Sequence, residues 1–86
     1  MRFYFHLHND VHTVDEEGRE LPDAGAAFAE ARDEARAMAA ESVRHGTLDL
    51  SHHVAVTDES GAVLFKVTFG EVVAISDLEG EPVGQT

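Results

Sequence analysis

The segment near the amino end carries histidines and an aspartate at spacings that suit metal binding: His6, His8, Asp10 and His12. On an extended strand, residues two apart point to the same side, so His6 and His8 would lie about 6–7 Å apart at Cα. Both imidazoles could then reach one divalent ion, with Asp10 or His12 completing the ligand set. The pattern makes these four residues a candidate site for weak binding of zinc or another divalent metal. The interpretation that we favour is that the histidines are solvated side chains on a strand face.

The same string resembles the His-x-His-x-Asp-His metal motif of metallo-β-lactamase-fold hydrolases. One additional residue separates Asp10 from His12 here, and that fold needs a much longer chain with further ligands, so we do not expect hydrolase chemistry. No serine sits in a glycine-flanked nucleophile elbow. The acidic run from Asp15 to Glu17 lacks the alternating ligands and central glycine of a calcium loop. The sequence therefore predicts no enzyme, no catalytic residue and no cofactor-binding residue.

Composition narrows the range of functions further. The chain has 86 residues with 17 Asp and Glu, 6 Lys and Arg, no Cys and a formal net charge of −11. This length allows one small domain, and the absence of Cys excludes disulfides and thiol chemistry. The charge argues against direct nucleic-acid binding; it serves either solubility or the mimicry of nucleic-acid phosphates. No apolar run suits a signal peptide or a membrane span, so we expect a cytoplasmic protein without membrane contact.

Alternation of apolar and polar residues predicts strands on both sides of a central helical segment. The first strand is expected over residues 2–8, and two more over 48–57 and 63–69. The last two flank Asp58-Glu59-Ser60-Gly61, whose Asp and Gly suit a type I turn closed by a bulge, so we expect a hairpin there. Asp15-Glu16-Glu17-Gly18 has the same turn chemistry and predicts a second, weaker hairpin.

A long amphipathic helix is predicted from Ala24 to His45, with Asp23 as its N-cap and Gly46 just after its end. Its small side chains allow a close approach to a sheet, which favours helix-on-sheet packing. The residues expected on its buried face follow a three-four spacing: Ala24, Phe28, Ala31, Ala35, Met38 and Ser42.

These elements predict an α+β fold with two layers, in which an antiparallel sheet of three to four strands packs on one long helix. The expected order is β-(β)-α-β-β. Residues 1–75 would form the single domain and residues 76–86 an acidic, flexible tail, while 70–75 fits either a short strand or one helical turn. The face of the sheet without the helix would carry Tyr4, His6, His8, His53 and Lys66.

Four segments resemble, in order, a family of short bacterial proteins. They are Arg2-Phe3-Tyr4-Phe5-His6, the stretch from Asp15 to Asp23 before an Ala-rich helix, Val56 to Gly61, and Val67-Thr68-Phe69. The family is common in rhizobia and related alphaproteobacteria and is classified as a domain of unknown function. The resemblance covers residues 2–75 and implies no activity, cofactor or site residue. A weaker likeness is to HicB-type antitoxins, which place a hairpin before a helix.

The features together favour a small non-catalytic protein that acts as an interaction or regulatory module. Its partner would be another protein or a second copy of the chain, held at open strand edges or at the sheet face that carries Tyr4. The alternatives are a histidine-based protein that binds zinc or another divalent metal, and an acidic nucleic-acid mimic or HicB-like antitoxin.

Overall fold

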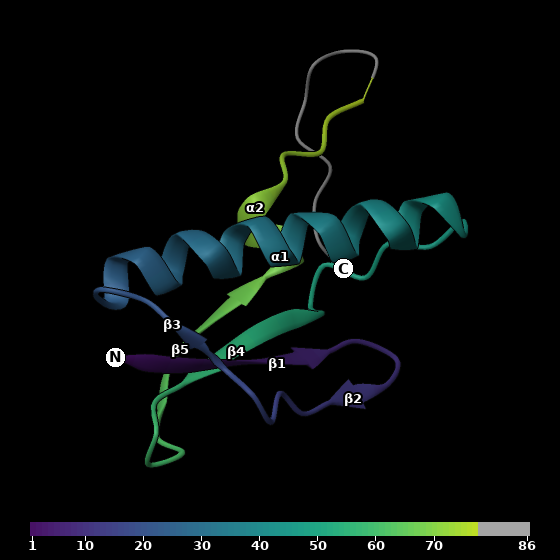
Figure 1. The fold of residues 1–86 in the computed structure, drawn as a ribbon. Coiled ribbons are helices and arrows are strands. Elements are labelled where there is room, and N and C mark those ends of the chain that lie inside the picture. Colours follow the sequence, from purple (N-terminus) through teal and green to yellow (C-terminus); the bar gives the residue numbers. More distant parts are fainter. Residues whose placement is uncertain (78–86) are drawn as a thin grey trace.

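The computed structural model describes residues 1–77, which form an antiparallel five-stranded sheet with one long helix lying across one face (Figure 1). The elements are β1 (Arg2–His8), β2 (His12–Thr13), β3 (Arg19–Glu20), α1 (Ala24–Arg44), β4 (His53–Thr57), β5 (Val63–Thr68) and α2 (Phe69–Val72). The predicted α+β class is confirmed. Of the tail expected over 76–86, residues 78–86 lie outside the described part of the chain.

The sheet runs in the order β2-β1-β4-β5, and β3 also pairs with β1. β2 and β3 are therefore two short pieces of one stretch that runs antiparallel along β1. Leu7 lies opposite Thr13, and Phe3 lies opposite Arg19, so the five residues 14–18 face only the three residues 4–6. This stretch bulges out of the ladder between its two paired pieces.

The predicted hairpin at Asp15–Gly18 is therefore wrong. The chain reverses earlier, at Asn9–Val11, where the side-chain oxygen of Asn9 accepts a hydrogen bond from the Val11 N–H at 3.0 Å. The Asp and Gly that suit a turn build the bulge instead, because Gly18 takes a φ of +70°. A Cβ there would lie 2.9 Å from the backbone oxygen of Phe3, so only glycine fits.

The core lies between the sheet and α1. The alternation predicted for the first strand is confirmed, since Phe3 and Phe5 are buried and Leu7 packs at the margin of the core. Apolar residues of the later elements complete it: Val54, Val56, Val67, Phe69 and Val72.

The helix buries a stripe of alanines that differs in part from the predicted face. The buried residues repeat strictly every fourth position: Ala27, Ala31, Ala35 and Ala39. Ala24 is exposed, and Phe28 is 42% exposed because it lies beside the stripe, with its ring 5.5 Å from that of Phe65 on β5. Large side chains of the helix lie beside the stripe, because only methyl groups fit where the helix packs directly on the strands.

The predicted helix ends are confirmed. The carboxylate of Asp23 accepts the Ala26 N–H at 2.8 Å, and Gly46 follows the helix with a φ of +87°. The hairpin between β4 and β5 is also confirmed: Asp58 accepts hydrogen bonds from the N–H groups of Ser60 and Ala62. The open choice for residues 70–75 resolves in part into the one-turn helix α2. None of the helices in residues 1–77 is both long and apolar enough to cross a bilayer.

Candidate functional site

Three histidines form a row across the face of the sheet opposite α1. His12 on β2 and His53 on β4 both lie opposite His8 on β1, so the register alone brings them side by side. The rings stack, with centroids 4.1 Å apart between His8 and His12 and 4.5 Å apart between His8 and His53. We refer to His12, His8 and His53 as the histidine row.

The central ring of the histidine row, His8, favours the neutral form. Burial, followed by the neighbouring His12, His53, Lys66 and His6, lowers the pKa of His8 below its ordinary value of 6.5. Each of these neighbours is a cation or becomes one on protonation, so a proton on His8 meets repulsion from both flanks of the row. A neutral His8 ring, stacked between its two neighbours, is therefore the state that this part of the sheet stabilises near neutral pH.

His6 lies on the same strand face but has a separate role. Its Nδ1 accepts a hydrogen bond from the Asp15 N–H at 3.1 Å, so the ring proton of the neutral form is on Nε2. That nitrogen lies 3.0 Å from the Thr57 hydroxyl, to which it donates. Both ring nitrogens are occupied in this way, and the side chain ties the bulge to β4.

The structure does not gather the four residues predicted to bind metal. Only His8 and His12 come into direct contact, while His6 binds protein groups through both nitrogens. Asp10 lies in the turn before β2 with its side chain 95% exposed, 3.7 Å from His52. In residues 1–77, no group of three or more potential ligands is arranged to hold a metal ion. The period of two correctly placed His6 and His8 on one face of β1, but the two side chains contact different groups on the neighbouring strands.

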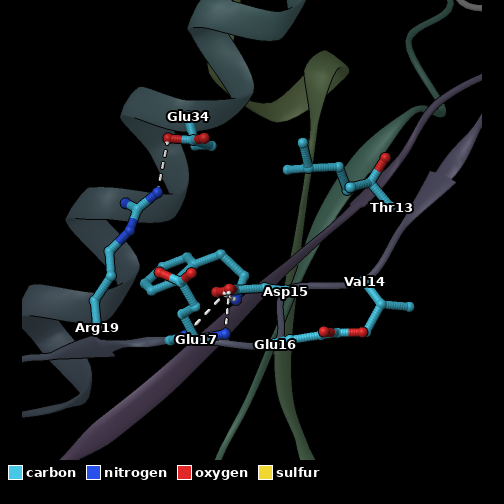
Figure 2. Close-up of a pocket in the computed structure, with 10 residues that line it drawn as sticks. Thr13, Val14, Asp15, Glu16, Glu17, Arg19 and Glu34 are labelled. Carbon is cyan, nitrogen blue, oxygen red and sulfur yellow. Dashed lines mark hydrogen bonds and ion pairs between the residues drawn. The ribbon is translucent and has the colours of Figure 1, made fainter.

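A cavity of about 480 Å³ opens beside the bulge, between β1 and α1. Phe5 and Leu7 contribute its apolar part, and Asp15, Glu16 and Glu34 are among the acids around it (Figure 2). The cavity lies at the bulge, where residues 14–18 outnumber the three residues opposite them by two and therefore lie farther from the core.

Asp15 serves as an anchor in this cavity. One carboxylate oxygen accepts the Phe5 N–H at 3.0 Å, and the other accepts the N–H groups of Glu17 and Gly18, both at 3.1 Å (Figure 2). Burial tends to raise the pKa of Asp15, but these three hydrogen bonds and nearby Arg19 hold it below the ordinary value. A carboxylate engaged in this way replaces missing ladder bonds and is a poor general base.

Arg19, the cation of the cavity, is also engaged. Its guanidinium lies 4.6 Å above the Phe5 ring and pairs with Glu30 at 3.0 Å and Glu34 at 3.3 Å. Cation–π contact and two ion pairs join β3 to α1 across the opening. The arrangement closes the core where the bulge would otherwise leave it uncovered, so we assign the cavity a structural role.

Sequence reasoning expected open strand edges as docking surfaces but did not say which strand, and in the structure a further surface of this kind lies along β5. Within residues 1–77 this strand pairs with β4 alone, and apolar side chains surround its outer side. Val63 is 56% exposed, Leu64 is 43% exposed, and Phe28 reaches over from α1. We refer to Phe28, Val63, Leu64, Phe65 and Lys66 as the β5 edge. The sequence signal was the run from 63 to 70, which has no acid in a chain of net charge −11.

The comparisons with known proteins give a family but no activity. A family described as a domain of unknown function (DUF6894) matches residues 2–70, which supports the predicted resemblance at this level. No curated protein and no solved structure matches the chain. The matched range runs from β1 through the first part of α2 and includes the bulge, the histidine row and the β5 edge. The chain therefore belongs to the DUF6894 family.

Proposed function

We propose that this chain is a non-catalytic module that acts by binding another protein chain along the outer side of β5. The observation that carries the proposal is the β5 edge: a strand that pairs only with β4 in the described part of the chain, bordered by exposed Phe28, Val63 and Leu64. A strand with free backbone groups can accept a further strand, and apolar side chains beside it supply affinity.

The two edges of the sheet are unequally protected against pairing with another strand, which supports this assignment. The side formed by β2 and β3 is broken by the bulge and carries acids at Asp15, Glu16 and Glu20, features that hinder pairing with another strand. The β5 side has one irregularity, at Leu64 near its start, is regular over residues 65–68, and has Lys66 as its one charged residue. Within residues 1–77, a partner strand therefore meets a regular stretch without acids over residues 65–68 of β5.

Two substitutions at exposed positions test the proposal. Leu64→Asp places a charge on the β5 edge, and Val11→Asp places the same charge on an exposed residue at the other end of the sheet. Far-UV circular dichroism should show that both variants fold. Each protein is immobilised and exposed to an extract of its source cells, and retained proteins are quantified by mass spectrometry. We expect specific retention to be lost with Leu64→Asp and kept with Val11→Asp; equal retention by both would contradict the proposal.

A further inference from the structure

We infer that the histidine row is a pH-sensitive switch: neutral rings hold residues 9–14 against β1, and protonation of the row releases this segment while the rest of the sheet stays folded. The segment contains the turn after β1, the strand β2 and Val14, and we refer to it as the β2 segment. The β5 edge takes no part in this switch, which goes beyond the proposed function. Three observations carry the inference: the contact between the rings, the unequal attachment of their strands, and the charged groups around them.

His8 is the central ring of the row, so a proton on it meets a neighbouring ring on each side. Its ring centroid lies 4.1 Å from that of His12 and 4.5 Å from that of His53. A second proton on either neighbour would place two cations in contact, so the stack weakens as the row takes up protons. Separation of one neighbour from His8 relieves this repulsion.

The two neighbours of His8 are attached to β1 to unequal extents. β4, which carries His53, pairs with β1 at five positions, and its residues 54–57 are buried. β2, which carries His12, pairs with β1 at two positions (Figure 1). Every residue from 9 to 14 is exposed. His12 therefore separates from His8 more readily than His53 does, because few other contacts hold it in place.

The release ends at the bulge. Asp15 follows Val14, and its carboxylate accepts three backbone N–H groups, among them that of Phe5 on β1, so the bulge stays attached. Thr13 and Val14 line the cavity beside the bulge. Their release opens the cavity and exposes Leu7, which packs at the margin of the core.

The basic neighbours of His8 set the direction of the switch. After burial, His12 and His53, the groups that lower the pKa of His8 are Lys66 on β5 and His6 on β1. Of these neighbours only His12 belongs to the β2 segment, so the others oppose a proton on His8 whether the segment is attached or released. Release removes His12 and the cover of its ring, and the released state therefore binds protons more readily. Its population rises as the pH falls below 6.5, the ordinary pKa of a histidine.

The acids near the row do not offset this effect. Asp10 in the turn lies 3.7 Å from His52 and would hold the β2 segment once His52 is protonated. The Asp10 side chain is 95% exposed, however, and His52 also lies 3.4 Å from Asp49, so this ion pair contributes little. At the other end of the row, the Glu71 carboxylate accepts hydrogen bonds from the N–H and the hydroxyl of Thr68.

Amide hydrogen exchange, followed by nuclear magnetic resonance on the purified protein, tests the inference. The Phe5 N–H points to Asp15, so Leu7, two residues on, directs its backbone groups to the same side and exchanges hydrogen bonds with Thr13. Protection at Thr13, taken as the intrinsic exchange rate divided by the observed rate at the same pH, therefore reports attachment of the β2 segment. We expect it to fall by about threefold to tenfold from about pH 7.5 to about pH 5, while Val54 in β4 keeps its protection.

Two substitutions at exposed histidines separate the switch from a general effect of pH. His12→Phe keeps an aromatic ring beside His8 but cannot take up a proton, so Thr13 should stay protected at about pH 5. His45→Gln removes a histidine whose side chain is 73% exposed at the end of α1, and the fall at Thr13 should match that of the wild type. Protection at Thr13 that does not change with pH, a parallel loss at Val54, or a fall that persists in His12→Phe would each overturn the inference.

Discussion

Replacement of Asp15 by Asn tests whether one carboxylate holds the bulge to β1. The carboxylate uses both oxygens, one for the Phe5 N–H and the other for the N–H groups of Glu17 and Gly18. The Asn side chain has one oxygen only, so its amide nitrogen must face a backbone N–H. If the oxygen stays with Glu17 and Gly18, the partly buried Phe5 N–H is left without an acceptor.

The expected cost follows from this geometry. Leaving one partly buried donor unsatisfied costs about 1–3 kcal/mol of the free energy of unfolding. For a domain of this size, ~4–8 °C per kcal/mol gives a fall in Tm of about 5–20 °C. Because the pKa of Asp15 is lowered by folding, its contribution is present above the unfolded-state value near 3.8 and is lost as the pH falls through the folded-state value. The difference between wild type and Asp15→Asn should therefore shrink below about pH 4.

Urea denaturation followed by far-UV circular dichroism measures this difference at pH 7 and again near pH 3. Asp58→Asn is the matched control, because Asp58 accepts N–H groups in the same manner in the exposed turn between β4 and β5. We expect a smaller loss there, since water replaces the missing acceptor. Equal losses in the two variants, or a difference for Asp15→Asn that does not depend on pH, would refute the anchoring role.

Three further predictions concern the bulge, the histidine row and the helix. Gly18→Ala should destabilise by about 3 kcal/mol or more, since its Cβ meets backbone at 2.9 Å, whereas Gly61→Ala, with φ +87° and open space, should cost only about 1–2 kcal/mol in urea titrations. Because folding lowers the pKa of His8, wild-type stability should fall as the pH drops below about 6.5; His8→Phe should flatten that decline between about pH 7 and 5, and parallel curves would contradict it. Ala31→Leu overpacks a fully buried position and should lower the free energy of unfolding by about 1–3 kcal/mol, seen as a lower Tm. Ala29→Leu, on the exposed side of the helix, should change the Tm little.

Local patterns predicted the parts of the fold that depend on local physics. The alternation over 2–8, the Asp23 cap and the Asp58–Gly61 hairpin were all correct, because each is decided within a few residues. The buried side of α1 was displaced because helical spacing allows several neighbouring stripes. Packing against the strands determines which stripe is buried. Ala27 and Ala31 fit at the line of closest approach, whereas Phe28 lies at its margin.

The candidate site depended on information that a single sequence does not contain. Asp15–Gly18 has the composition of a hairpin turn, and only the pairing of β3 with the start of β1 turns it into a bulge. The histidine row likewise needs the register that sets His8 opposite His53, residues far apart in the chain. Spacing along one strand could place His6 and His8 on a common face, but it could not show which rings would touch.

The bulge between β2 and β3 also decides what kind of assembly this sheet can enter. A sheet with two regular edges can add copies without limit and grow into a fibre. Here the edge formed by β2 and β3 is interrupted at residues 14–18, so the described sheet has no second regular edge opposite β5. A strand added at β5 therefore cannot be followed by growth from the other edge. The same five residues that complicate the fold thus protect a short, strand-rich chain against polymerisation.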